Sequence, residues 1–140
     1  MIATPESTRQ ARTQFESGFG DALITYELEG LQMIERKFPV EIVMPRATIL
    51  SEHTVVLIDR RMKPAKRQLV EAFIKYLWSD VAQKAFVRYH FRPITDDTFE
   101  GLNPGFRKVE HPFTIADLGG WPRAHREIIE NAWKYKIQAM

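Results

Sequence analysis

The sequence contains no cysteine, which excludes a disulfide framework, a thiolate nucleophile and a thiolate-bound metal. It also has no apolar run near the roughly 20 residues that a membrane-spanning helix needs. Residues 1–7 show neither the basic start nor the apolar core of a secretory signal, so we expect no export signal in this chain. A large excess of one sign of charge is absent too, because 20 Lys and Arg against 18 Asp and Glu leave a formal net charge of +2.

Patterns that carry catalytic or metal chemistry are also missing. The four histidines are scattered and show no metal-ligand spacing. They are His53, His90, His111 and His125. We find no nucleophile elbow, no phosphate-cradling glycine loop and no carboxylate pair beside a nucleophile. The sequence therefore predicts no enzyme activity, no catalytic residue, no bound metal and no cofactor.

One dense basic run lies in residues 60–67, with Asp59 and Glu71 beside it. Nucleic-acid-binding proteins usually spread Lys and Arg along a whole face, which this chain does not do. We interpret the run as a solvated loop and helix start, with a phosphate-binding patch as the alternative. Nucleic acid is not among the predicted partners.

What is present is the composition of a soluble globular protein of ordinary domain size. The 140 residues are 44% hydrophobic and 27% charged. Short apolar runs rich in β-branched residues predict strands at residues 22–26, 40–44 and 54–58. Residues 45–53 between the second and third runs are interpreted as extended linking chain.

Helical patterns alternate with these strands. The strongest begins at Pro64 and carries one wide apolar stripe, and we expect further helices over residues 5–16, 28–38, from Asp80 and from Pro122. Asp80 and Gln83 suggest a capping box. Strands alternating with helices indicate an α/β fold, but three strands make a thin sheet for this much helix.

Four stretches, in order, resemble the sulfate/thiosulfate-binding family of ABC transporter receptors. The first is residues 18–29 (GFGDALITYELE), and the second is residues 45–59 (PRATILSEHTVVLID). The third is residues 71–79 (EAFIKYLWS) with Gln83 and residues 91–93 (FRP), and the fourth is residues 113–121 (FTIADLGGW). Each is weak alone, but the ordered set covers nearly everything from Thr13 to about Ile129.

The resemblance has departures. Asp80 stands where the family often has Pro, Leu118 replaces an aromatic residue, and the N-terminal half of the family is absent. The resemblance therefore implies an α/β, partial type II periplasmic-binding-protein-like fold, with a short β-sheet flanked by helices and a long C-terminal helix. It implies a single C-terminal segment with a strand near the cleft at 21–27, a hinge strand region at 40–59 and a helical part at 64–138. It also implies a periplasmic or extracellular location.

The site residues are carried over by position. In sulfate-binding members of the family a Trp at the position of Tyr26 donates its ring N–H to the anion, so Tyr26 is the candidate ligand residue. A phenol hydroxyl can donate in the same way, while the alternative is a packed aromatic whose hydroxyl lies on a neighbouring carbonyl. Asp21 either orients the turn before the strand predicted at residues 22–26 or caps an Asx turn. The replacement of Trp by Tyr leaves the identity of the anion open.

Two further features are left with two interpretations each. Pro45, Ile49, Leu50 and Glu52 form either an interlobe hinge or a plain connecting loop. The second feature is the two carboxylates of Glu27 and Glu29. They either pair with a cation elsewhere or are ordinary exposed helix-start carboxylates.

Two functions follow as hypotheses. The first is a substrate-binding component, or a fragment of one, of an ABC transporter for an inorganic oxyanion such as sulfate, thiosulfate or molybdate. Its partners would be the oxyanion and, in a full-length receptor, the transporter's membrane subunits. The second is a truncated, non-binding relative that acts as a self-association or protein-interaction module and forms a homodimer in isolation.

Overall fold

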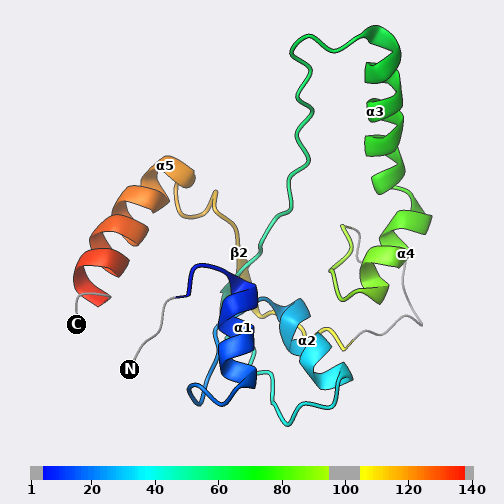
Figure 1. The fold of residues 1–140 in the computed structure, drawn as a ribbon. Coiled ribbons are helices and arrows are strands. Elements are labelled where there is room, and N and C mark those ends of the chain that lie inside the picture. The colour runs from blue at the N-terminus through cyan, green and yellow to red at the C-terminus, as the bar shows by residue number, and fades with distance from the viewer. Residues whose placement is uncertain (1–4, 95–104, 138–140) are drawn as a thin grey trace. The chain divides into compact units, whose positions relative to one another are not determined.

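The computed structural model describes residues 5–94 and 105–137 (Figure 1). In chain order the elements are α1 (Thr8–Glu16), α2 (Glu27–Glu35), β1 (Ala47–Ile49), α3 (Pro64–Leu77), α4 (Asp80–Arg88), β2 (His111–Phe113) and α5 (Trp121–Ala124). A π-helix, η1 (His125–Ile137), continues α5. The predicted α/β class, the short sheet and the long C-terminal helix are confirmed. The predicted helical part at 64–138 includes residues 95–104 and 138, which lie outside the described residues.

The chain divides into two compact units that are interleaved in sequence. The first unit comprises residues 1–25, 43–52 and 108–140, and the second comprises residues 26–42 and 53–107. Both strands and the α5–η1 helix belong to the first unit, whereas α2, α3 and α4 belong to the second. Among the described residues no helix has both the length and the apolar character needed to cross a bilayer.

In the first unit, β1 and β2 form a parallel pair of three residues each, with Ala47 opposite His111 and Ile49 opposite Phe113. Backbone bonds extend the pair at both ends, because His111 N donates to Arg46 O at 2.9 Å and Leu50 N donates to Phe113 O at 2.7 Å. The pairing thus joins segments far apart in the sequence.

The predicted placement of the strands is wrong. Residues 22–26, 40–44 and 54–58 contain no strand, and β1 lies in the stretch interpreted as linking chain. β-Branched side chains favour extended backbone, but a strand also needs a neighbour that satisfies its N–H and C=O groups. Within the described part of the chain, only β1 and β2 provide one another with that neighbour.

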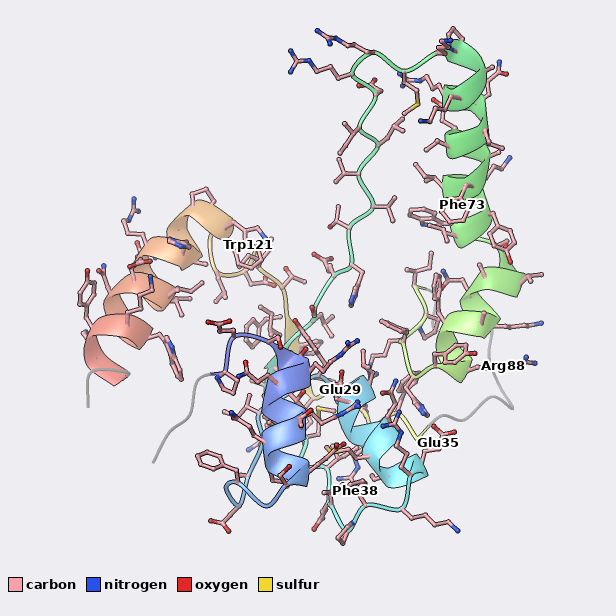
Figure 2. The ribbon with its side chains drawn as sticks, viewed as in Figure 1. Glu29, Glu35, Phe38, Phe73, Arg88 and Trp121 are labelled. Carbon is pink, nitrogen blue, oxygen red and sulfur yellow. The ribbon has the colours of Figure 1, made fainter. Side chains whose placement is uncertain are left out.

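The helices agree better with the sequence pattern. α3 begins at Pro64 as expected, and the predicted apolar stripe is present on it. The stripe is only partly covered. No residue of α3 is fully buried, and Leu69 is 72% exposed and Phe73 59% exposed (Figure 2). α2 ends at Glu35, earlier than predicted, and Lys37 just beyond it adopts a left-handed backbone with φ of 62°.

Buried apolar side chains among the described residues are few and small. Those of the second unit lie on α2 and α4: Leu31, Met33, Ala82 and Val87. Gly30 lies so close to Ile42 that a Cβ would meet its Cγ1 at 3.0 Å. In the first unit Ala124 is the buried apolar residue. Such a core is small for a chain of 140 residues.

The start of α4 corrects the predicted capping box by one residue. The cap is Ser79, whose Oγ accepts from Ala82 N at 3.4 Å. The buried Gln83 is not a capping partner: its amide donates to Leu77 O at 2.8 Å and its carbonyl accepts from Ile94 N at 3.2 Å. Both the NH2 and the carbonyl of the Gln83 side chain have partners, so it can be buried at little cost. These bonds connect α4 to the end of α3 and to the chain that follows α4.

Replacing the cap provides a test. We expect Ser79→Ala to lower the free energy of unfolding by about 1 kcal/mol, because a helix N–H loses its acceptor. Urea unfolding followed by circular dichroism measures this change. Ser79→Asp, which retains an acceptor oxygen, is the matched control and should unfold at nearly the original urea concentration. An alanine variant as stable as the aspartate variant would contradict the assignment of the cap.

In the first unit, a tight turn precedes α5. Thr114 donates to Asp117 Oδ2 through its backbone N–H at 2.7 Å and through its hydroxyl at 3.0 Å. These two bonds, the backbone one first, hold the pKa of Asp117 below its ordinary value. Gly119 and Gly120 then follow with φ of 82° and 79°, which reverses the chain into α5.

This turn predicts a dependence of stability on pH. A carboxyl whose folded pKa is depressed contributes stability that is present above its unfolded pKa, about 3.9, and is lost as the pH falls through the folded pKa. We therefore expect Asp117→Asn to lower the melting temperature more at pH 7 than at pH 2. Differential scanning fluorimetry at the two pH values measures the two differences. Equal differences would contradict a role for the Asp117 charge.

Candidate functional site

The candidate ligand residue, Tyr26, occupies the N-cap position of α2. Its backbone is extended (φ −71°, ψ 147°), and its carbonyl accepts from Glu29 N at 3.0 Å and from Gly30 N at 3.4 Å. The side chain is half-exposed, and no described residue hydrogen-bonds its hydroxyl. The carbonyl partner that the packed-aromatic interpretation expects is not among the described residues. Its role as an anion ligand stays a prediction.

Asp21 is exposed and follows Gly20, whose φ is 84°. It belongs to the first unit, whereas the second unit begins with Tyr26. No described residue accepts or donates a hydrogen bond at the Asp21 carboxylate, so the Asx-turn alternative has no bond to support it among these residues. Turn orientation by Asp21 stays a prediction.

The predicted hinge residues all fall in residues 43–52, a short insertion of the first unit between two parts of the second. Ile49 is the last residue of β1, and the backbone of Leu50 is fixed by its bond to Phe113. Pro45 and Glu52 lie outside the strand. Connections between units are where hinges occur, so dihedral change is expected on either side of β1 rather than within it. The hinge itself stays a prediction.

An ion pair next to Tyr26 joins Glu27 to a partner that sequence reasoning did not identify. Arg92 Nε lies 2.6 Å from Glu27 Oε2, and Arg92 Nη2 lies 2.8 Å from Glu27 Oε1. This is a bidentate pair between residues 65 apart in the sequence, and the Glu27 side chain is only 17% exposed. Of the two interpretations given to the first carboxylate after Tyr26, pairing with a distant cation is confirmed.

Further contacts fix the Arg92 guanidinium. It donates to Arg107 O at 2.6 Å and lies 4.9 Å from the centre of the Phe106 ring. Arg107 in turn donates to Ile42 O at 2.6 Å. Arg92 therefore connects the start of α2, the chain after α4 and residues 106–107. Glu27 and Arg92 both lie in stretches that carry the family resemblance, but only their proximity in space reveals the pair.

The start of α2 combines the partial positive charge of a helix N-terminus with acidic side chains. Helix N-termini carry partial positive charge, and Figure 2 shows Glu29 and Glu35 toward the two ends of α2. No group of acidic residues and histidines suited to a metal ion occurs among residues 5–94 and 105–137. The helix start thus offers a phenol hydroxyl and a fixed dipole beside a carboxylate that is already paired.

The basic run of residues 60–67 is partly paired with the acidic residues beside it. Arg67 lies 2.7 Å from Asp59 and 2.7 Å from Glu71, and the hydrogen bond to Glu71, followed by that to Asp59, raises the pKa of Arg67. These side chains are about half-exposed, so such pairs contribute little to stability. The contacts fit the interpretation as a solvated loop and helix start.

Known proteins similar to this chain bind sulfur oxyanions. The chain is 30% identical over 139 residues to a sulfate-binding protein of Synechococcus elongatus, covering 95% of this chain and 39% of that protein. It is 34% identical over 123 residues to a sulfate-binding protein of Escherichia coli, covering 85% and 37%. It is 32% identical over 118 residues to a thiosulfate-binding protein of Pseudomonas aeruginosa, covering 81% and 35%.

The chain therefore spans less than two-fifths of the length of these relatives. A family model described as bacterial extracellular solute-binding protein matches residues 2–92, which include the start of α2, the hinge candidates and Arg92. The resemblance seen in the four sequence stretches is confirmed, and the chain belongs to the bacterial extracellular solute-binding protein family.

Proposed function

We propose that this chain is a substrate-binding component of an ABC transporter, or part of one, and that it binds an inorganic oxyanion such as sulfate, thiosulfate or molybdate. The observation that carries the proposal is the alignment of 81–95% of the chain with proteins named for sulfate or thiosulfate binding. In this function the chain corresponds to the C-terminal portion of a receptor, acts outside the cytoplasm and delivers its anion to the transporter's membrane subunits.

The physical basis of binding is replacement of water around the anion by fixed neutral donors. A dianion needs no formal counter-charge if enough N–H and O–H dipoles point at it in a site from which water is excluded. Tyr26 is the donor proposed from this chain, and its hydroxyl is uncommitted among the described residues. A phenol hydroxyl supplies one O–H donor to such a site.

The chain is proposed to contribute only part of that set of donors. It covers 35–39% of its relatives, and the Tyr26 side chain is half-exposed rather than enclosed. One wall of a cleft replaces the hydration shell of a dianion poorly, so we expect weak binding by this chain alone, with a dissociation constant on the order of 1 mM. The remaining donors come from the part of the receptor that this chain does not contain.

Titration of the isotope-labelled chain with sulfate, followed by amide chemical shifts in NMR spectra, tests the proposal. We expect saturable shifts around Tyr26, and about fivefold weaker binding in Tyr26→Phe, because one hydrogen bond contributes about 1 kcal/mol. Tyr76→Phe is the matched control, since Tyr76 is 50% exposed and Tyr26 is 48% exposed.

The same titration with thiosulfate, molybdate, tungstate and phosphate ranks the anions. Tight, stoichiometric binding by the chain alone would contradict the proposal that donors are missing. No saturable shift with any of these anions would contradict oxyanion binding at Tyr26.

Exposed apolar surface favours a second property, self-association of the isolated chain. Ile58 is 78% exposed, Leu69 is 72% exposed and Phe73 is 59% exposed, and all three lie on the extended segment and α3 of the second unit. Apolar surface of this kind is rarely left open to water and is most simply covered by a symmetric homodimer. This homodimer is compatible with either hypothesis of function.

Multi-angle light scattering tests the homodimer. We expect the isolated chain to be dimeric at high micromolar concentration, and Leu69→Ser with Phe73→Ser to shift it toward monomer, because the apolar stripe of α3 is interrupted. Circular dichroism serves as the control for folding, since neither side chain is buried. A monomer at high concentration of the unaltered chain would contradict self-association.

A further inference from the structure

We infer that Arg92 is a positioning residue for the anion site proposed at Tyr26. It holds Glu27 in a neutral pair and so removes a full negative charge from the helix start where a dianion is proposed to bind. The inference deepens the proposed function and rests on it. Nothing in the spacing of the sequence assigns this role to Arg92.

The argument begins with the charge of α2. Its first turn carries Glu27 and Glu29, which stabilise the helix because they face the positive end of its dipole. The same carboxylates oppose anion binding, since a dianion would compete for that positive end and be repelled by them. Glu27 is the residue after Tyr26, so its charge is closest in sequence to the proposed donor. Neutralising Glu27 would therefore remove one of the two negative charges in the first turn of the helix where the anion is proposed to bind.

The contacts show how Arg92 neutralises Glu27. Both carboxylate oxygens of Glu27 accept from Arg92, at 2.6 and 2.8 Å. The pair is partly shielded, because the Glu27 side chain is 17% exposed and that of Arg92 is 37% exposed. Shielding from water reduces screening of the pair, so the two charges cancel more completely than in an exposed surface pair.

The Arg92 guanidinium makes two further contacts. Its bond to Arg107 O and its position over the Phe106 ring orient the planar fork toward Glu27. A lysine would preserve the charge but not the bidentate fork or the stacking. The arrangement orients the Glu27 carboxylate and cancels its charge. It thereby also holds the start of α2 at Tyr26 in place.

Two roles of Arg92 make different predictions. If the pair is only a cross-link, removing either partner or both should have the same effect. If Arg92 neutralises Glu27, Arg92→Gln should weaken anion binding because it leaves the carboxylate unpaired. Glu27→Gln should then bind the anion at least as well as the unaltered chain, and the double variant should recover binding because it carries no charge at either position.

The experiment is a sulfate titration at constant ionic strength, with the amide shifts around Tyr26 followed by NMR. The chains compared are the unaltered protein, Arg92→Gln, Glu27→Gln, the double variant and Arg92→Lys. We expect about tenfold weaker binding for Arg92→Gln and recovery to within about twofold in the double variant. Arg36→Gln, which removes a cation at the other end of α2, is the matched control and should bind as the unaltered chain does.

The outcomes separate this inference from the proposed function. Saturable shifts of equal strength in every variant, or a double variant as weak as Arg92→Gln, would overturn the role of Arg92 and leave oxyanion binding intact. No saturable shift in the unaltered chain would overturn the proposed function and this inference with it. If Arg92→Gln does not fold, Arg92→Lys decides the question, since it retains the charge and should bind within a few-fold of the unaltered chain.

Discussion

A backbone segment becomes a strand only where a neighbouring segment satisfies its N–H and C=O groups, and the described structure follows from that constraint. Residues 54–58 have the β-branched composition of a covered strand, yet they run as extended chain without a partner. The short stretch at β1 forms a ladder because β2 lies beside it. Burial also needs a neighbour, since the stripe of α3 is well formed but only partly covered.

Membership of the solute-binding family gives these partly covered surfaces a physical context. The chain matches relatives that are more than twice as long, and it spans 39% and 37% of two of them. What the chain does hold are local features that need no distant partner: the Ser79 cap, the turn at Thr114 and Asp117, and the helices themselves.

The Glu27–Arg92 pair shows how charge and fold are connected in the second unit. Acidic residues at a helix start favour the helix but oppose an anion, so the same residue type serves stability and hinders binding. Pairing with a fixed guanidinium reconciles the two, because the carboxylate keeps its place at the helix start while its charge is cancelled. The same guanidinium brings residues 106–107 to the start of α2.

The sequence by itself determined the helices, the α/β class and the family. Pro64 and the apolar repeat of α3 act within a few residues of one another, so their effect can be read along the chain. Tertiary structure alone decided the strands and the ion pair at Tyr26. β1 meets β2 across some 60 residues of chain, and Glu27 meets Arg92 across 65, and no local pattern encodes such distances. Strand pairing and ion pairing depend on proximity in space, whereas capping and helical periodicity depend on proximity in sequence.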